Sequence, residues 1–159
     1  MSRILFLDFD GVMIPTRAYW LEGQTRPVTK FDPCAVSLLN KVCEENDLKI
    51  VLVTSWRRTV LGQIPEDLKK HCINNGIKEE FIHEDYQCPW KFTSSKYNDV
   101  NFWLENHPEV KDYIIVDDDL DDEYGHKGKI IVPVFDEGLN YDIYLKVSRH
   151  FDNKARLVF

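Results

Sequence analysis

The sequence lacks any hydrophobic run long enough to cross a membrane. A membrane-spanning helix needs about 20 consecutive apolar residues, whereas the apolar run nearest the N-terminus covers only Ile4 to Leu7 and stops at Asp8. That run is also too short for the apolar region of a secretory signal peptide. We therefore expect a cytoplasmic protein that makes no contact with a membrane.

Paired cysteines are absent as well. The four cysteines, Cys34, Cys43, Cys72 and Cys88, are scattered and form no CxxC pair, which argues against a disulfide framework. A zinc site that joins Cys72 and Cys88 to His83 can be drawn, but its spacing matches no common zinc module. Reduced and mostly buried thiols are the favoured interpretation, and they agree with a cytoplasmic protein.

The chain has no excess of basic residues. Its formal net charge is -7, which argues against nonspecific nucleic-acid binding by the whole surface and leaves a local basic groove open. A length of 159 residues with no internal repeat predicts a single domain over residues 1–159. A chain of this length buries roughly 70% of the surface that it exposes when unfolded.

Short apolar segments alternate with amphipathic segments along the chain, which predicts an α/β fold with a central parallel sheet and right-handed crossovers. We expect one Rossmann-like domain of three layers, α/β/α. The predicted strands are residues 3–7, 49–54, 81–83, 113–116 and 129–134. The predicted helices are residues 33–46, 65–75 and 140–150, and a further helix that starts at Ser94 or Ser95 and ends at about residue 106.

The stretch from about Met13 to Phe31 has no clear periodicity and is too long for a tight turn. It is typical of a hairpin or flap that leaves the end of the first strand, and irregular loops of this length are often functional. Its aromatic residues, Tyr19 and Trp20, favour a simpler interpretation, in which they pin the loop to the body of the protein.

Three of the predicted strands end in polar side chains, and parallel strands present their carboxyl ends at one edge of the sheet, where ligands bind. Taken alone, the end of the first strand, Asp8 to Gly11, is equally well explained by an ordinary Asp-Gly turn. Lys96 stands at the start of a predicted helix, an unfavourable place for a cation unless an anion lies nearby. Taken alone, it is better interpreted as a solvated surface lysine. The residues at the strand ends are Asp8, Asp10, Thr54, Ser55, Asp117 and Asp118.

These residue types suit phosphoryl transfer. Carboxylates from two strands form a hard oxygen site that fits Mg²⁺. A hydroxyl and an ammonium group beside the metal can hold phosphoryl oxygens, and a free aspartate can act as the nucleophile. A second aspartate two residues further on can protonate the leaving group and then deprotonate water.

In these motifs the chain resembles phosphatases of the haloacid dehalogenase (HAD) superfamily. The DxDG motif corresponds to Asp8 through Gly11, the hydroxyl residue to Thr54, the basic residue to Lys96, and the acidic pair to Asp117 and Asp118. All four motifs occur in the family's order and span most of the chain. A receiver-type signalling domain uses similar residues, but in a different order along the chain.

The resemblance implies a role for each residue. Asp8 would be the nucleophile that forms an aspartyl-phosphate and a ligand of Mg²⁺. Asp10 would be the general acid and base and would bind the metal through its backbone carbonyl. Thr54, or Ser55 in its place, would hold the phosphoryl oxygens together with Gly11.

The remaining implied roles concern charge. Lys96 would neutralise the negative charge of Asp8 and of the phosphate. Asp118 would be the direct metal ligand and Asp117 would assist it, while Asp119 could share in the metal shell. These assignments make Mg²⁺ the expected cofactor and a phosphorylated molecule the expected substrate.

Within the superfamily, the chain is similar to small members without a large cap, including those beside RNA-repair enzymes and the phosphatase half of polynucleotide kinase-phosphatases. Residues 13–31 and 56–95 are too short for a large cap domain. An open site suits a bulky substrate, either a polynucleotide end or a phosphoprotein. The alternatives are a phosphatase of nucleotides or small metabolites and a noncatalytic binding module.

Basic residues near the predicted site allow a contact with a nucleic-acid backbone. Arg57, Arg58 and Lys91 are the candidates, and ordinary surface charges are an equally good interpretation of them. Trp56, which follows the second strand, is expected to pack in the core rather than to stack on a base.

Overall fold

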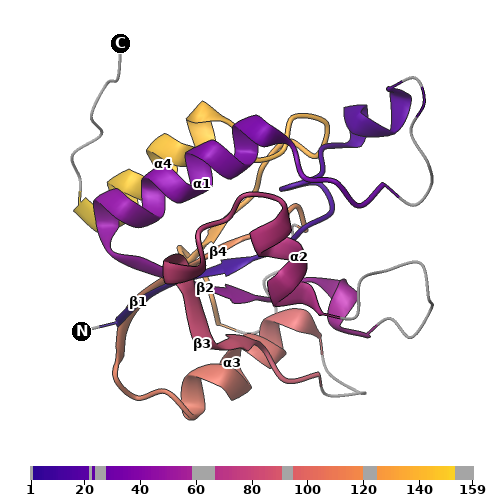
Figure 1. Ribbon diagram of the computed structural model, residues 1–159. Helices are drawn as coiled ribbons and strands as arrows, with labels where there is room; N and C mark the ends of the chain where they lie inside the picture. Colours follow the sequence, from indigo (N-terminus) through magenta and orange to yellow (C-terminus); the bar gives the residue numbers. More distant parts are fainter. Residues whose placement is uncertain are drawn as a thin grey trace.

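Five parallel strands form an open sheet in the order β3-β2-β1-β4-β5 (Figure 1). This computed structural model describes residues 2–21, 23, 28–58, 67–90, 95–119 and 125–152. The strands are β1 (Ser2–Leu7), β2 (Leu48–Leu52), β3 (Ile82–Gln87), β4 (Val110–Val116) and β5 (Ile130–Ile131). The helices are α1 (Pro33–Asn46), α2 (Leu68–Asn74), α3 (Lys96–Glu105) and α4 (Tyr141–Asp152). The predicted Rossmann-like α/β fold with a central parallel sheet is confirmed.

Strand β1 lies at the centre of the sheet and is buried on both faces. Its side chains alternate between two hydrophobic clusters: Leu5 and Leu7 join the cluster beneath α1 and α4, and Ile4 and Phe6 join the cluster around α3. Figure 1 shows α1 and α4 side by side over one face and α3 on the other. This is why four consecutive apolar residues are required here.

Side-chain caps define where α1 and α3 begin. The Asp32 carboxylate accepts a hydrogen bond from the Cys34 N–H at 3.2 Å, and Pro33 takes the first helical position of α1. The Ser95 hydroxyl caps α3 in the same way, through the Asn98 N–H. Such caps satisfy backbone donors that a helix leaves free at its start, and they explain why the predicted starts of these helices are correct.

The structure shifts several predicted boundaries. Strand β2 ends at Leu52 rather than at residue 54, because the chain turns into the short helix η2 (Ser55–Arg58). Strand β3 continues to Gln87, and β5 covers only two residues of the predicted 129–134. Helix α2 begins after its cap at Asp67, and residues 65 and 66 of the predicted helix lie outside the described part of the chain.

The stretch between β1 and α1 contains a short helix, η1 (Thr16–Trp20). Tyr19 is partly buried and packs against the core, as predicted. The prediction for Trp20 is wrong, because this residue is 81% exposed. Residue 22 and residues 24–27 of the predicted flap lie outside the described residues.

The cysteines are free thiols, and three of the four are buried, as predicted. Burial raises the pKa of Cys43 and of Cys72 to about 12. Cys72 belongs to the cluster beneath α1 and α4, whereas Cys88 belongs to the cluster around α3. The sheet separates these two residues, which rules out the zinc site drawn from them. Among the described helices, none combines the length and the apolar character needed to cross a bilayer.

Candidate active site

The parallel hydrogen-bond ladder continues one residue beyond the central strands and brings their ends together. The Asp8 N–H donates to the Val116 carbonyl at 3.1 Å, and the Val53 N–H donates to the Leu7 carbonyl at 3.0 Å. The chain segments that carry Asp8, Thr54 and Asp117 therefore lie side by side at the carboxyl edge of the sheet, where the sequence predicted them.

Lys96 forms ion pairs with two buried carboxylates at this edge. Its Nζ atom lies 2.9 Å from Asp117 Oδ2 and 3.3 Å from Asp8 Oδ2. Lys96 is the first residue of α3, where the helix dipole disfavours a cation. The two carboxylates supply the compensating charge, as the sequence suggested.

Burial and the repulsion between neighbouring carboxylates raise the pKa of two aspartates in this group. Burial and the neighbouring Asp117 raise the pKa of Asp8 well above its usual value, against the opposing effect of Lys96. Burial and Asp117 also raise the pKa of Asp118. Burial would lower the pKa of Lys96, but Asp8 and Asp117 raise it, so the lysine is held in its charged form.

Asp118 completes an acidic cluster that suits a divalent cation. Asp8, Asp117 and Asp118 each offer a carboxylate oxygen, and these oxygens lie within 4.8 Å of one another. Asp117 Oδ2 is buried and has no hydrogen-bond donor aligned with it, although the Lys96 ammonium is close. Three carboxylates against one ammonium leave an excess of negative charge, and the oxygen donors fit Mg²⁺.

Asp119 stands apart from this cluster. Asp119 is an exposed residue whose backbone forms two hydrogen bonds near the cluster. Its N–H donates to Asp117 Oδ1 at 3.0 Å, and its carbonyl accepts from the Tyr97 hydroxyl. Asp119 thus fixes the orientation of Asp117 instead of joining the three carboxylates.

Gly11 makes room for Asp118, and its replacement by alanine tests this contact. A Cβ atom at Gly11 would lie 2.3 Å from Asp118 Oδ2, and its φ of +75° disfavours any other residue. We expect Gly11→Ala to lower any metal-dependent turnover at least tenfold, because Asp118 must move, and to cost about 1 kcal/mol of stability from backbone strain.

The matched control is Gly128→Ala, because Gly128 has a similar φ of +81° with open space around it. That variant carries the strain without the contact, so it should lose stability but keep turnover. Equal loss of turnover in both variants would contradict a specific role for the space beside Asp118.

Thr54, rather than Ser55, is the hydroxyl enclosed within the site. Thr54 is fully buried, and its Oγ1 accepts a hydrogen bond from the Trp56 N–H at 3.3 Å. The hydroxyl proton can therefore be donated to a ligand. Ser55 is exposed, and this difference favours Thr54 as the residue that faces the phosphoryl group.

Trp56 holds the side chain of Asp10. Its ring is 5% exposed and packs against Phe9, which confirms that it is a core residue. In addition, its Nε1–H donates to Asp10 Oδ2 at 2.9 Å. This contact, which orients the second aspartate of the DxDG motif, could not be predicted from the sequence.

Arg57 was interpreted from the sequence as a surface residue, and this is wrong. Its guanidinium is fully buried and forms an ion pair with the buried Asp99 at 3.2 Å. It also donates hydrogen bonds to the carbonyls of Val53, Thr54 and Cys88. Arg57 therefore joins the ends of β2 and β3 to α3, the helix that carries the candidate lysine.

This burial excludes Arg57 from contact with a nucleic-acid backbone and corrects that interpretation. The side chain of Arg58 and the whole of Lys91, the other two candidates, lie outside the described residues. Arg57 is an internal residue that ties the ends of β2 and β3 to Asp99 of α3, a use that suits the planar guanidinium.

An open parallel sheet with paired aspartates, a hydroxyl, a lysine and an acidic pair at its carboxyl edge has the arrangement of a HAD-type domain. Residues 4–142 match the family described as the HAD domain in Swiss Army Knife RNA repair proteins. The chain belongs to this family, whose membership supports a hydrolase of the phosphatase type. No curated protein and no solved structure matches the chain significantly.

Proposed function

We propose that this protein is a magnesium-dependent phosphomonoesterase that acts through an aspartyl-phosphate on Asp8. The observation that carries the proposal is the ion-paired group of Asp8, Lys96 and Asp117 at the end of the central strand. Phosphate monoester hydrolysis is extremely slow without a catalyst, and this group supplies a nucleophile and a compensating charge in one place.

In the first step, a carboxylate oxygen of Asp8 attacks phosphorus and the ester bond to the alcohol breaks. Asp10 gives its proton to the departing alkoxide, which leaves as an alcohol. In the second step, Asp10 takes a proton from water, the water oxygen attacks phosphorus, and Asp8 is released with inorganic phosphate. The bond from Trp56 to Asp10 keeps the acid and base in one orientation.

Lys96 and Thr54 stabilise charge during both steps. The Lys96 ammonium lies close to Asp8, so it can stabilise the negative charge on the phosphoryl oxygens while Asp8 attacks. The Thr54 hydroxyl donates to one of these oxygens, and burial strengthens both interactions because water is excluded. Neither group needs to be deprotonated at any point.

Asp8, Asp118, Asp117 and the Asp10 carbonyl would hold Mg²⁺. When bound, the metal supplies positive charge against the phosphate oxygens and screens the repulsion among the carboxylates. We expect chelation to reduce phosphate release by about 100-fold or more, because metal stabilisation of the transition state is worth several kcal/mol.

The substrate that we favour is the phosphorylated end of a polynucleotide, or another bulky phosphoester. Two features support this class: the family's description names RNA repair, and the described segment between β1 and α1 contributes only the short helix η1 beside the site. A site without a large cap admits a chain that extends away from its phosphate. Nucleotides and small metabolites are the competing class.

A phosphate-release panel distinguishes these classes. It compares oligonucleotides with 3'- or 5'-phosphates, nucleoside monophosphates, sugar phosphates and phosphopeptides, each with Mg²⁺ and with chelator. Selective release from an oligonucleotide end is the expected result. Release from small metabolites alone would contradict the proposed substrate, and no magnesium-dependent release from any member would favour a noncatalytic module.

A further inference from the structure

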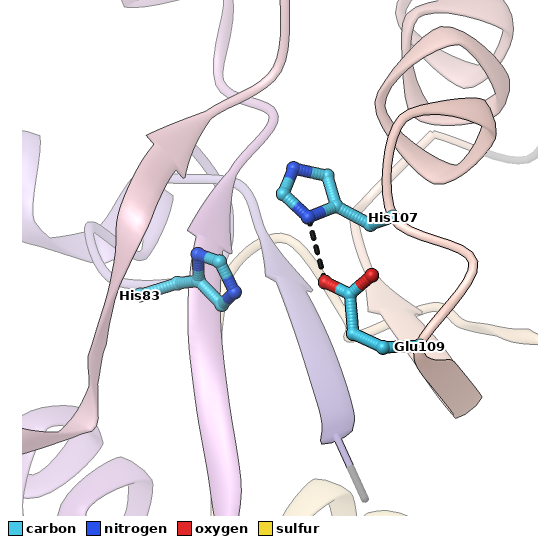
Figure 2. A group of neighbouring side chains, drawn as sticks. All are labelled: His83, His107 and Glu109. Atoms are coloured by element: carbon cyan, nitrogen blue, oxygen red, sulfur yellow. Dashed lines mark hydrogen bonds and ion pairs between the residues drawn. The ribbon is translucent and has the colours of Figure 1, made fainter.

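Two histidines and a glutamate lie together near the amino-terminal ends of β3 and β4, whereas the candidate active site lies at the carboxyl ends of the strands. His83 lies near the start of β3, and His107 and Glu109 lie in the connection between α3 and β4. Their ligand atoms lie within 4.8 Å of one another, and Figure 2 shows the three side chains pointing toward one another. None of these residues belongs to a HAD motif that the sequence analysis found.

His107 is held in one orientation from three sides. Its ring stacks on Trp103 with the ring centroids 3.8 Å apart and the planes 17° from parallel. Its Nε2 atom lies 2.8 Å from Asp85 Oδ2, and its Nδ1 atom lies 2.8 Å from Glu109 Oε1. The ring therefore presents Nδ1 to the glutamate while a carboxylate fixes the opposite nitrogen.

The contact with Asp85 is one that metal-binding histidines share, whereas the Nδ1–Glu109 hydrogen bond at 2.8 Å is exchanged for the metal when it binds. A histidine that binds a metal through one nitrogen commonly donates the proton of the other to a carboxylate, which fixes the tautomer and makes the ligand more basic. Asp85 occupies that position for His107. His83 packs against the same tryptophan, with ring centroids 5.1 Å apart, so one indole supports both imidazoles.

We propose that His83, His107 and Glu109 form a binding site for a divalent transition metal, of which Zn²⁺ is the best fit. Two imidazole nitrogens and one carboxylate oxygen suit zinc, whereas Mg²⁺ prefers an all-oxygen shell. Glu109 is about half exposed, so water can complete the coordination. The inference is independent of the proposed phosphatase activity.

The metal would bind His83 through Nε2, because Nδ1 faces the Asp85 N–H at 2.9 Å. Coordination places the proton of the neutral His83 ring on Nδ1, and the Asp85 N–H must then turn to water. The loss of this hydrogen bond is a cost of binding at Nε2, which water can offset only where it reaches the Asp85 N–H. The exchange makes metal binding weaker than in a fully prearranged site but does not prevent it.

The location indicates a structural role. Strand β3 is an edge strand, and its pairing with β2 shifts register between Ile50 and Leu52. A metal at this site would join β3 directly to the segment that precedes β4. A metal that binds only the folded state stabilises it, by an amount that grows with the logarithm of the free metal concentration once this exceeds Kd.

The test measures thermal unfolding and zinc binding by calorimetry in a Cys34→Ser background, because Cys34 is the exposed thiol among the cysteines. Millimolar Mg²⁺ is present throughout to occupy the acidic cluster. We expect one zinc ion per chain and, at a hundredfold excess over Kd, a rise in Tm of roughly 5 °C. Glu109→Gln and His107→Ala should abolish the rise, and Asp85→Asn should weaken binding about 10- to 100-fold.

His150→Ala is the matched control, since this histidine lies elsewhere and contacts Asp112. It should bind zinc as the parent does. Glu109 is exposed, so Glu109→Gln keeps the test informative if His107→Ala fails to fold. An unchanged Tm with excess zinc, or binding that persists in both site variants, would overturn the proposal.

Discussion

Asp8→Asn is expected to reduce magnesium-dependent phosphate release by at least about 10⁴-fold, since a catalytic nucleophile is removed. The amide retains the shape of the side chain but cannot form an acyl phosphate in one displacement. It also weakens the ion pair with Lys96, whose Nζ lies 3.3 Å from Asp8 Oδ2. The measurement is initial rate on the best substrate of the panel.

The variant should stay folded, and the pKa of Asp8 gives the direction of its stability change. Because burial and Asp117 raise the pKa of Asp8 well above the ordinary value of 3.8, the folded state binds this proton more tightly than the unfolded chain does. Ionisation therefore costs stability as the pH rises through the folded-state pKa. In chelator at pH 7, the free energy of unfolding of Asp8→Asn should equal or exceed that of the parent, and the difference should vanish below pH 3.8.

Asp136→Asn is the matched control, because Asp136 is an exposed carboxylate outside the site. It should keep activity within about twofold. Full activity in Asp8→Asn would refute the nucleophile, whereas loss of both activity and structure would show only that the residue is needed for folding. Unfolding curves of each variant separate these outcomes.

Arg57→Ala is expected to lower the free energy of unfolding by about 3–5 kcal/mol, because removing one partner of a buried ion pair leaves the other charge without compensation. Asp99 is fully buried beside Arg57. The carbonyls of Thr54 and Cys88 also lose a donor. Urea denaturation at pH 7 measures the change.

Lys146→Ala is the control for this prediction. Lys146 pairs with Asp142 at 3.0 Å, but both side chains are more than half exposed, and such surface pairs contribute at most about 1 kcal/mol. A comparable loss in the two variants would contradict the claim that Arg57 is an internal support. Arg57→Lys should recover part of the stability, because it keeps the charge without the planar fork.

The sequence predicted the fold and the site residues where local chemistry decides the outcome. Asp8 and Asp117 follow runs of apolar residues that can only be buried strands, and parallel strands align their carboxyl ends. The helix-start position of Lys96 hinted at a nearby anion, but the lysine was assigned to the site through its place among the four HAD motifs. The roles of these residues, in contrast, remain predictions until activity is measured.

The contacts of Arg57 and Trp56 could not be predicted from the sequence, because they join distant parts of the chain. Asp99 lies 42 positions after Arg57, and Asp10 lies 46 positions before Trp56. A charged residue is usually exposed, so the sequence alone favours the surface for Arg57. The zinc candidate shares this difficulty, since His83 and His107 come from separate elements and form no short motif.

Direct detection of phosphate on Asp8 tests the central claim. The protein is mixed with excess substrate and Mg²⁺, quenched in acid within a turnover, and treated with borohydride, which reduces an acyl phosphate to an alcohol. The account predicts homoserine at position 8 by peptide mass spectrometry, in the parent protein and only with substrate. Phosphate release without modification of Asp8 under conditions that trap acyl phosphates, or equal release from Asp8→Asn, would contradict it.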